Sequence, residues 1–312
     1  MQFSELKLKD RTLFEQTFCL NNYELSTYNF NNIFIWKDAF KIFYIILNGY
    51  VCVFFKDKNG CFMYLPPLPF KMPRYTGIGG SAEDHRLSAI KICFKIMDSF
   101  NSNKNISRIE NVDENNLAFF RECNYAYLAK PGDYIYKRDD LTSLRGERFK
   151  SKRSSYNYFV RHYDFKFNSF SKQNKDECLA LYQQWAKQRK VKFSDNIYQA
   201  MLEEGFRCQR LAMDNFAQLG LVGYLIKIKN KIIGYTLGYP INNRMFCILF
   251  EACDLNYKGV SQFIFSEFCQ QLSGYKYINI MDDSGLDNLR KVKLSYHPIC
   301  VLANYIIKKD YA

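Results

Sequence analysis

The chain has 312 residues, of which 48% are hydrophobic and 17% aromatic, and its formal net charge at pH 7 is +13. This apolar content is sufficient for two domains with cores of their own and excludes a largely disordered protein. The positive charge favours an anionic partner, either nucleic acid, an acidic membrane surface or a phosphate-bearing substrate, without choosing among them.

The eleven cysteines are scattered and contain no C-x-x-C pair, and no two of the three histidines have metal-ligand spacing. We therefore expect reduced, mostly buried thiols in a cytoplasmic protein, and no metal. Residues 1–14 lack the apolar core of a signal peptide. The most apolar stretch, 39–55, contains Lys41 and the turn pair Asn48-Gly49, so it suits a hairpin better than a membrane span. The protein is expected in the cytoplasm, either free or peripheral at the inner membrane face.

The first half opens with apolar runs that predict strands, at residues 32–36, 43–47, 50–55 and 61–70. Asn48-Gly49 predicts a hairpin between the second and third runs. Helical spacing of the apolar residues Leu87, Ile90 and Phe94 predicts a helix over 82–100. Short strands at 106–110 and 133–137 close this half.

A glycine-rich segment precedes the helix over 82–100. Arg74, Gly77 and Gly79 fit the R-x-x-G-x-G phosphate loop of coenzyme A-dependent acetyltransferases, in which glycines let the backbone approach a pyrophosphate. Against this, prolines break the strand that should lead into the loop, and short glycine motifs also match by chance. Coenzyme A is therefore kept as an alternative cofactor, and the leading interpretation needs none.

The second half follows a similar plan. Its predicted elements are a basic helix over 144–163, helices over 175–190 and 195–219, strands at 221–229, 231–240 and 244–254, a helix over 261–272 and a strand at 275–281. Strands followed by a turn, a helix and a strand in both halves indicate an α+β fold of two tandem domains, with mixed sheets flanked by helices. The boundary is predicted between 136 and 146, which gives domains 1–140 and 141–312.

The basic segment 144–163 carries six lysines and arginines against one acid, Glu147. As a helix it would turn Phe149, Tyr156 and Val160 toward the core. The segment could be an ordinary solvated helix, or it could contact phosphates and stack on unpaired bases. In the second case the candidate substrate-binding residues are Arg148, Lys152, Arg153 and Asn157.

The end of the strand at 244–254 carries Glu251 and Asp254, just before the turn Tyr257-Lys258-Gly259. Either acid could act as a general base if burial raises its pKa, and either could equally form a strand-end ion pair. Glu251 is the preferred candidate. No residue is singled out as a nucleophile, so we expect direct attack by the acceptor on an activated ester, with positioning supplying most of the rate.

Residues 281–298 combine acids, Arg290 and Lys293 before Tyr-His-Pro. If a helix starts near Gly285, Ser284 and Asp287 occupy capping-box positions, and a capped helix explains the charges completely. Alternatively, Arg290 and Lys293 lie three residues apart on one face and hold an anionic group, because arginine suits phosphate, while Asp283 holds an amino group.

Three segments, 133–159, 249–268 and 277–298, resemble the C-terminal domain of the phosphatidylglycerol lysyltransferases, also called aminoacyl-phosphatidylglycerol synthases, and more closely its stand-alone soluble relatives. The likeness starts near Tyr28 and is strongest from Asp133 to Pro298. Asp283, Arg290 and Lys293 fall on the family's D-x-G-x-x-x-L-R-x-x-K pattern, which favours the substrate-binding interpretation. Met281 and Asn288 depart from the soluble relatives, where an acid and a glycine are expected, and this chain lacks the membrane flippase of the full-length synthases.

The resemblance implies two acetyltransferase-type (GNAT) domains in tandem. It also implies transfer of an amino acid from aminoacyl-tRNA to an amine or hydroxyl acceptor, such as phosphatidylglycerol, an anionic lipid at the membrane surface, or a small molecule or peptide. Two alternatives stay open. One is an acyl-coenzyme A-dependent N-acyltransferase, and the other is a non-catalytic RNA- or membrane-binding module on the same fold.

Overall fold

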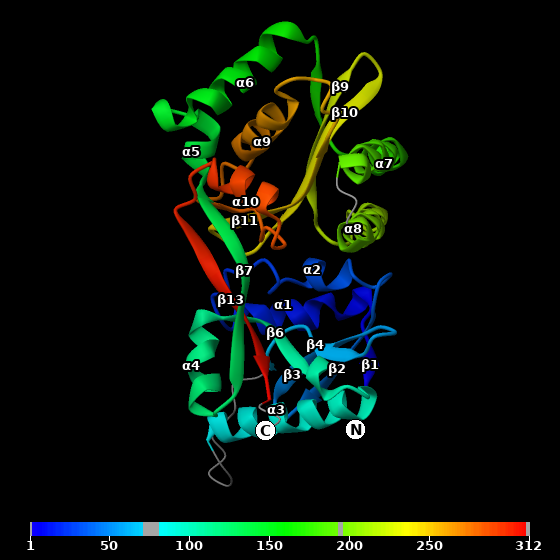
Figure 1. Cartoon of the computed structure of the whole chain (residues 1–312), viewed down its shortest axis with the longest axis vertical. Coiled ribbons are helices and arrows are strands. Elements are labelled where there is room, and N and C mark those ends of the chain that lie inside the picture. Colours follow the sequence, from blue (N-terminus) through cyan, green and yellow to red (C-terminus); the bar gives the residue numbers. More distant parts are fainter. Residues whose placement is uncertain (1, 71–80, 193–195, 310–312) are drawn as a thin grey trace. The chain divides into compact units, whose positions relative to one another are not determined.

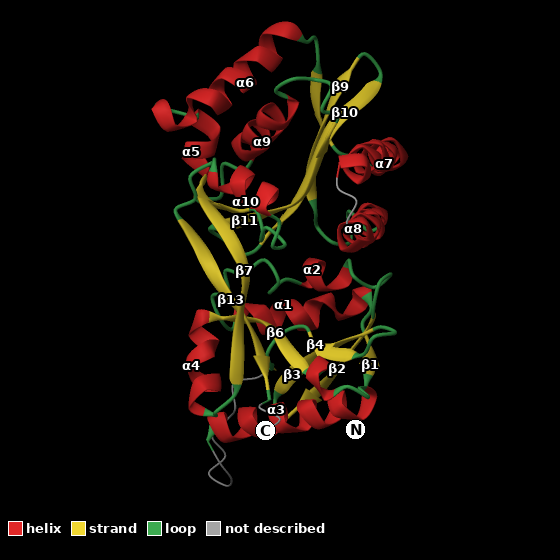
Figure 2. Ribbon diagram, in the orientation of Figure 1, coloured by secondary structure: helices red, strands yellow, loops and turns green. Residues whose placement is uncertain are grey.

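The computed structural model describes residues 2–70, 81–192 and 196–309 (Figure 1). The chain forms two compact units. The first contains Met1–Gly132 and Leu302–Ala312, and the second contains Asp133–Val301. Each unit is a mixed sheet flanked by helices (Figure 2), as expected from the sequence.

The sheet of the first unit has the strand order β1-β2-β3-β4-β6-β13-β7, with β5 paired to β3. The strands are β1 (Ser4–Glu5), β2 (Lys41–Leu47), β3 (Tyr50–Lys56), β4 (Cys61–Met63), β5 (Leu68–Pro69), β6 (Arg108–Asp113), the first part of β7 (Ala126–Lys137) and most of β13 (Cys300–Lys308). The helices are α1 (Arg11–Cys19), α2 (Phe30–Phe34), α3 (Ala82–Phe100) and α4 (Glu114–Glu122), with short 3₁₀ turns at Leu8–Asp10 and Lys104–Ile106. Apolar residues of α3 and α4 pack on β2, β3 and β6 to form the core.

Local sequence explains most of this unit. Asn48 and Gly49 have φ of 50° and 83°, the left-handed conformation that a two-residue hairpin turn needs, and they join β2 to β3. Ser81 and Asp84 form a reciprocal capping box at the start of α3. The expected strand at 32–36 was wrong. Asn29 caps a short helix there by accepting a hydrogen bond from the Asn31 amide, and the apolar residues of α2 are buried without forming a strand.

The sheet of the second unit has the order β7-β12-β11-β10-β9-β8. Its remaining strands are β8 (Lys166–Ser169), β9 (Val222–Ile228), β10 (Lys231–Pro240), β11 (Met245–Cys253) and β12 (Tyr277–Asn279). The helices are α5 (Arg138–Ser143), α6 (Lys150–His162), α7 (Lys175–Lys192), α8 (Asn196–Asp214), α9 (Val260–Gln271) and α10 (Asp287–Leu294), with 3₁₀ turns at Glu147–Phe149 and Lys172–Asn174.

Helices cover both faces of this second sheet. Figure 1 shows α7 and α8 on one side of β9 and β10, and α9 on the other. Alternate strand residues divide between the two faces, as the two-residue period of a strand requires. Tyr235, Leu237 and Ala252 pack toward α7 and α8, whereas Ile233 and Cys253 pack toward α6 and α9.

The units divide inside β7 and near the start of β13, whereas the sequence analysis placed the division at residue 140. β7 is one unbroken strand from Ala126 to Lys137, so no linker marks the change of unit. β13 pairs antiparallel with β6, and residues 302–308 therefore belong to the first unit.

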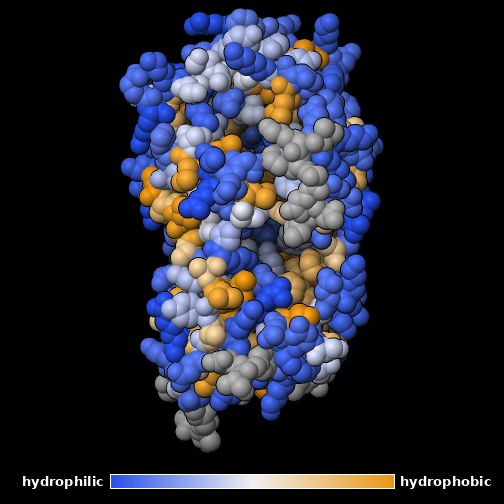
Figure 3. Space-filling view, viewed as in Figure 1, coloured by the Kyte–Doolittle hydropathy of each residue, from blue (hydrophilic) through white to orange (hydrophobic). Residues whose placement is uncertain are grey.

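The cysteines are free thiols, and all except Cys19, Cys123 and Cys300 are buried. Within the described ranges no helix combines the length and the apolarity of a membrane span. Figure 3 shows hydrophilic residues over much of the face in view, with hydrophobic ones in small separate groups.

Candidate active site in the second unit

The side-chain direction of Glu251 is set by a β-bulge in β11. Leu237 of β10 pairs with Phe250 and the next residue, Gly238, pairs with Ile248, so Leu249 is the extra residue. Phe250 and Ala252 face α7 and α8. Glu251 therefore points to the opposite face, the one covered by α9.

Glu251 is exposed to solvent but is surrounded by protein on most sides, and the resulting desolvation raises its pKa to about 8. No ion pair or hydrogen bond engages its carboxylate among the described residues. A carboxyl group that titrates near neutral pH and is open to solvent can take up and release a proton under ordinary conditions.

β11 and β12 are paired only at one end. Met245, Phe246 and Cys247 pair with Tyr277, Ile278 and Asn279 in parallel register. β12 then ends at Asn279 while β11 continues to Cys253. The part of β11 that carries Glu251 thus has β10 as its neighbour on one edge and no described strand on the other.

Tyr296 and Lys152 bring the segments 281–298 and 144–163 together near Glu251. Burial raises the pKa of Tyr296 well above its usual range. The negative charge of the Glu251 carboxylate raises it further, to a smaller extent. The Lys152 ammonium lies 4.2 Å from the centre of the Tyr296 ring, and burial lowers its pKa. The next residue along, His297, places Nε2 3.1 Å from the backbone oxygen of Arg148. Segments about 145 residues apart in sequence therefore meet on one face of this unit.

Asp254, the second candidate base, is occupied by structural contacts. Its Oδ2 accepts a hydrogen bond from Lys231 Nζ at 3.0 Å, and its Oδ1 accepts from Asn256 Nδ2 at 2.9 Å. Burial alone would raise the pKa of Asp254, but the bond with Lys231 and those with Asn256 hold it below its ordinary value. These contacts match the strand-end ion pair that the sequence analysis kept open.

Lys293 does not share an exposed face with Arg290. Only 7% of the residue is exposed, and its ammonium donates to three successive backbone oxygens, those of Ile280, Met281 and Asp282, at 2.5, 3.1 and 2.5 Å. All three donors of the ammonium are used. Burial lowers the pKa of Lys293, with nearby carboxylates acting in the opposite direction. The expected anion-binding pair is thus replaced by a lysine that fixes the turn after β12.

Asp283 forms a buried pair with Tyr134 of β7. Its Oδ2 accepts from the Tyr134 hydroxyl at 2.7 Å, and its Oδ1 accepts from the Gly285 amide at 3.0 Å. Burial and the bond to Asp283 raise the pKa of Tyr134 to about 12, while the Arg290 guanidinium acts in the opposite direction. Arg290 is exposed and forms no ion pair with a described residue. It is therefore a cation near Asp283 that is available to a ligand.

The turn before α10 also differs from expectation. The helix begins at Asp287 with Leu286 as its N-cap and no side-chain cap, so Ser284 and Asp287 do not form a capping box. Ser284 and Gly285 have φ of 52° and 71°, which is incompatible with a helix starting at Gly285. The Ser284 amide donates to the Asp282 carboxylate at 2.7 Å and the Gly285 amide donates to the Asp283 carboxylate at 3.0 Å, and these bonds hold the left-handed backbone.

The outer side of α6 forms a groove of about 360 Å³. Its lining residues are cationic or aromatic for the most part: Lys150, Arg153, Ser154, Asn157, Tyr158, Arg161 and His162. Tyr158 stacks on His162 at 3.9 Å, and Lys258 Nζ lies 4.5 Å from the centre of the Tyr158 ring. Arg153 also donates to the backbone oxygen of Gly146 at 3.1 Å, so part of its role is to secure the chain before α6.

The sequence-predicted site residues thus separate into three places. Glu251 and Lys152 adjoin Tyr296, Asp283 and Arg290 adjoin Tyr134, and Arg153 and Asn157 line the groove on α6. Arg148 pairs with Asp140 at 3.0 Å beside the His297 contact. Arg74, Gly77 and Gly79 lie outside the described residues.

The family described as phosphatidylglycerol lysyltransferase, C-terminal, matches residues 92–308, which is more than half of the chain. The chain belongs to this family. It is thereby a member of an acyltransferase family. The match covers all of the second unit together with the last third of the first.

An uncharacterised protein of Mycoplasmoides gallisepticum is 26% identical over 180 residues, which are 56% of this chain and 56% of that protein. The chain therefore matches little more than half the length of this curated relative. Among solved structures, a protein of unknown function from Bacteroides thetaiotaomicron superimposes with a TM-score of 0.83 at 24% identity, over 99% of this chain and 100% of that chain. L-PGS of Bacillus licheniformis gives 0.60 at 14% identity, over 87% and 85%. These likenesses show that the fold shared with L-PGS extends through both units.

Sequence reasoning missed the tyrosines of this family member. Tyr134 and Tyr136 lie two residues apart on β7, and Tyr136 donates to the Lys293 backbone oxygen at 2.8 Å. Their spacing of two residues in "DYIYK" places both side chains on one face of a strand. This pattern could have predicted that both hydroxyl groups bind the same neighbouring segment. Tyr296 carried no such signal, because its importance depends on Glu251 and Lys152, which are distant in sequence.

Proposed function

We propose that the protein transfers an amino acid from aminoacyl-tRNA to an amine or hydroxyl acceptor, with Glu251 as the general base. The observation that carries this proposal is the carboxyl group of Glu251, which is open to solvent, has a pKa of about 8 and lies where β11 has parted from β12. Family membership supports the reaction class.

The reaction needs a base because the acceptor must lose a proton as it attacks the ester carbon. The amine or hydroxyl forms a new bond to the aminoacyl carbonyl carbon and its proton passes to Glu251. The ester bond to the tRNA ribose breaks, and the leaving ribose oxygen takes up the proton from Glu251. A base works best when its pKa is near the working pH. The protonated Tyr296 hydroxyl nearby could donate a hydrogen bond to the reacting groups, because its raised pKa keeps its proton in place.

The groove on α6 supports tRNA as the carrier of the amino acid. Lys150, Arg153 and Arg161 supply positive charge along one side of the helix, and the stacked Tyr158 and His162 offer a ring surface for an unpaired base. Such a combination suits single-stranded RNA ends better than a duplex, because bases are free to stack only where they are unpaired.

Arg290 and Asp283 are proposed to act beside this chemistry. Arg290 would contact a phosphate of the tRNA end, and the Tyr134–Asp283 pair would help to hold the aminoacyl ammonium group. Lys293 would have a positioning role, because it fixes the turn that presents Asp283.

The substrates are proposed from the name of the family, which points to a lysyl group and to phosphatidylglycerol. Both substrates can be tested directly. Purified full-length protein is incubated with radiolabelled lysyl-tRNA or alanyl-tRNA and with vesicles that contain phosphatidylglycerol, vesicles of phosphatidylcholine alone, or a small-molecule cell extract. We expect label to move from tRNA into one acceptor fraction and to do so at least about a hundredfold more slowly in Glu251→Gln, in line with the loss of a general base.

Asp176→Asn is the matched control, because this acid lies on α7 and its side chain is 93% exposed. It should transfer at the wild-type rate. Label that stays on the tRNA in every arm, or equal rates for Glu251→Gln and the wild type, would contradict the proposal. Acetyl transfer from acetyl-coenzyme A without any aminoacyl transfer would instead favour the coenzyme A-dependent alternative.

A further inference from the structure

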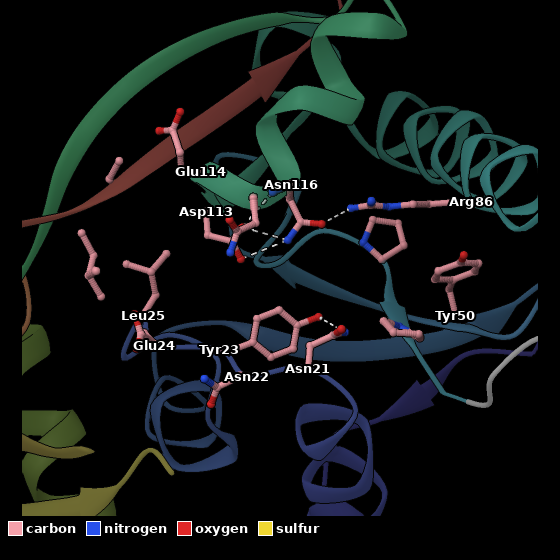
Figure 4. Close-up of a pocket in the computed structure, with 15 residues that line it drawn as sticks. Asn21, Asn22, Tyr23, Glu24, Leu25, Tyr50, Arg86, Asp113, Glu114 and Asn116 are labelled. Atoms are coloured by element: carbon pink, nitrogen blue, oxygen red, sulfur yellow. Dashed lines mark hydrogen bonds between the residues drawn. The ribbon is translucent and has the colours of Figure 1, made fainter. Parts of the chain in front are cut away.

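A second polar cavity lies wholly within the first unit. Its volume is about 780 Å³, which is within the range of small-molecule sites. It is lined by the loop after α1, the start of α4, residues of α3 and β3, and Leu302 and Ala303 of β13. Figure 4 shows Arg86 and Tyr50 on one side of it, Glu24 and Glu114 on the other, and Asp113 with Asn116 between them.

Arg86 is the unusual residue of this cavity. Its NH2 group donates to Asn116 Oδ1, and its guanidinium carbon lies 4.4 Å from the centre of the Phe119 ring. Its Nε is buried and has no hydrogen-bond partner, and no described carboxylate forms an ion pair with it. Burial lowers the pKa of Arg86. A largely buried cation without an anion is costly to a protein, and such groups are normally paired.

The carboxylate nearest in the network does not neutralise Arg86. Asp113 caps α4 by accepting from the Asn116 amide at 2.8 Å, and it also accepts from Asn116 Nδ2 at 3.0 Å. Asn116 thus stands between the two charges and holds both in place. Asn116 orients the Arg86 guanidinium but carries no charge to neutralise it. The guanidinium can therefore bind an anion, as a preorganised anion-binding site does.

The charges of the cavity limit what this anion can be. Arg86 is the single cation among the lining residues, whereas Glu24, Asp113 and Glu114 are acids. A phosphate group would be matched by one cation and repelled by three carboxylates. A carboxylate is matched by one arginine, and an ammonium group on the same molecule would be attracted to the acidic side.

We propose that this cavity binds a zwitterionic amino compound, an amino acid or short peptide, with its carboxylate on Arg86 and its ammonium group toward Glu24 and Glu114. The separation of Arg86 from these acids in Figure 4 favours an extended ligand such as a short peptide. This site goes beyond the transfer reaction proposed above. Its test uses no tRNA, so the outcome of either test leaves the other proposal standing.

The test is calorimetric titration of the full-length protein with trialanine, with its two singly blocked forms and with inorganic phosphate. Trialanine should bind, N-acetyl-trialanine and trialanine amide should each bind at least tenfold more weakly, and phosphate should not bind. Alanine is titrated as well, and weaker binding than that of trialanine supports the extended ligand. Silence with every amino compound, or phosphate binding more tightly than trialanine, would overturn the proposal.

Variants separate a ligand-binding arginine from a structural one. Arg86→Gln should lose trialanine binding while its binding of trialanine amide, which has no carboxylate, stays unchanged. Its melting temperature without ligand should be equal to or above that of the wild type, because an uncompensated buried charge is removed. Glu114→Gln should weaken trialanine but leave N-acetyl-trialanine unaffected.

Lys95→Gln is the control for loss of one positive charge, since Lys95 is an exposed residue of the same helix, α3, outside the cavity. It should bind trialanine as the wild type does. Should Arg86→Gln unfold at a lower temperature and still bind trialanine with unchanged affinity, Arg86 would be a structural residue and the proposal would fail.

Discussion

At the scale of single residues, Glu251 and Asp254 show how environment separates two acids that the sequence presents as equals. They are three residues apart at the end of one strand. Asp254 has Lys231 and Asn256 as partners, which lower its pKa, whereas Glu251 has no partner among the described residues and desolvation raises its pKa to about 8. The sequence could place both acids at a strand end, but the ion pair of Asp254 with Lys231 of β10 could not be predicted from it.

The raised pKa of Glu251 predicts a stability change with pH. The folded state holds the Glu251 proton more tightly than the unfolded state does, since the pKa is about 8 rather than 4.5. The stability contributed by this proton is therefore fully present below pH 4.5 and is lost as the pH rises toward 8. In Glu251→Gln this loss should be absent. Urea unfolding of both proteins at pH 5.5, 6.5, 7.5 and 8.5 measures the difference, and parallel curves would contradict the assigned pKa.

The same residue should set the pH dependence of transfer. Because only the deprotonated carboxylate can accept the acceptor's proton, the rate is expected to rise about tenfold per pH unit below 8 and to level off above it. Initial rates of label transfer, corrected for spontaneous hydrolysis of aminoacyl-tRNA, provide the profile. A rate that is flat between pH 6 and 8 would count against Glu251 as the base.

Lys293 and Arg290 form a matched pair for a further prediction, because both are cations of α10 with opposite surroundings. Lys293→Met should lower the free energy of unfolding by roughly 2–4 kcal/mol, since three backbone oxygens lose their donor. Arg290→Ala should change it by no more than about 0.5 kcal/mol, as for most surface substitutions, while weakening tRNA binding. Chemical denaturation decides the first point, and a fall in stability for both variants would show that Arg290 is structural too.

At the scale of elements, periodicity predicted those helices and strands whose pattern is set locally. The helix over 82–100 coincides with α3 because its capping box and its apolar spacing agree. The apolar run at 32–36 was misassigned because burial of a short run does not distinguish a strand from a helix, and the cap at Asn29 decided it. β13 was not predicted, since its residues are mostly exposed or half-buried and its place depends on pairing with β6, about 190 residues earlier.

The packing of α6 on α9 depends on one glycine. Gly259 has φ of 87°, and a Cβ built there would lie 2.1 Å from the backbone oxygen of Ser155 in α6. Gly259→Ala should therefore cost roughly 2–4 kcal/mol, from left-handed strain together with overpacking.

Gly274→Ala serves as the control for Gly259→Ala, because nothing lies within 4 Å of the added carbon and the backbone is not left-handed. Its unfolding free energy should stay within about 0.5 kcal/mol of the wild type. Denaturation followed by circular dichroism compares the two. If both substitutions were harmless, the close contact between α6 and α9 would not be what holds the basic helix in place.

At the scale of the whole molecule, the net charge predicts a class of partner but not where on the protein that partner would bind. The net charge of +13 favours an anionic partner, and the structure places three cations beside the stacked Tyr158 and His162 in one groove of the second unit. It also reveals an acid-rich cavity in the first unit that a sequence-wide sum could not show. The family and the α+β class were predictable from three motifs in order, whereas the inward turn of Lys293 was not, because a spacing of three residues cannot reveal which side chain is buried.

The groove predicts a salt-dependent affinity for tRNA. If its three cations, Lys150, Arg153 and Arg161, each neutralise one phosphate of a single-stranded end, the logarithm of the association constant should fall against that of salt concentration with a slope of about −2. Fluorescence titration between 50 and 300 mM KCl measures it. Replacing Lys150 and Arg161 together by alanine should reduce the slope by about 1.4. An unchanged slope in that double variant would place the RNA elsewhere.

The entry of the chain into the second unit through β7 and its exit through β13 has a consequence for biosynthesis. All of residues 133–301 are synthesised before the strand that completes the sheet of the first unit. Until then β6 lacks its neighbour on that edge, and the site that Ile307 fills in the first core is empty. The portion translated first is therefore the last to be completed, and a released chain that ends at residue 301 should expose an unfinished N-terminal sheet to chaperones and proteases.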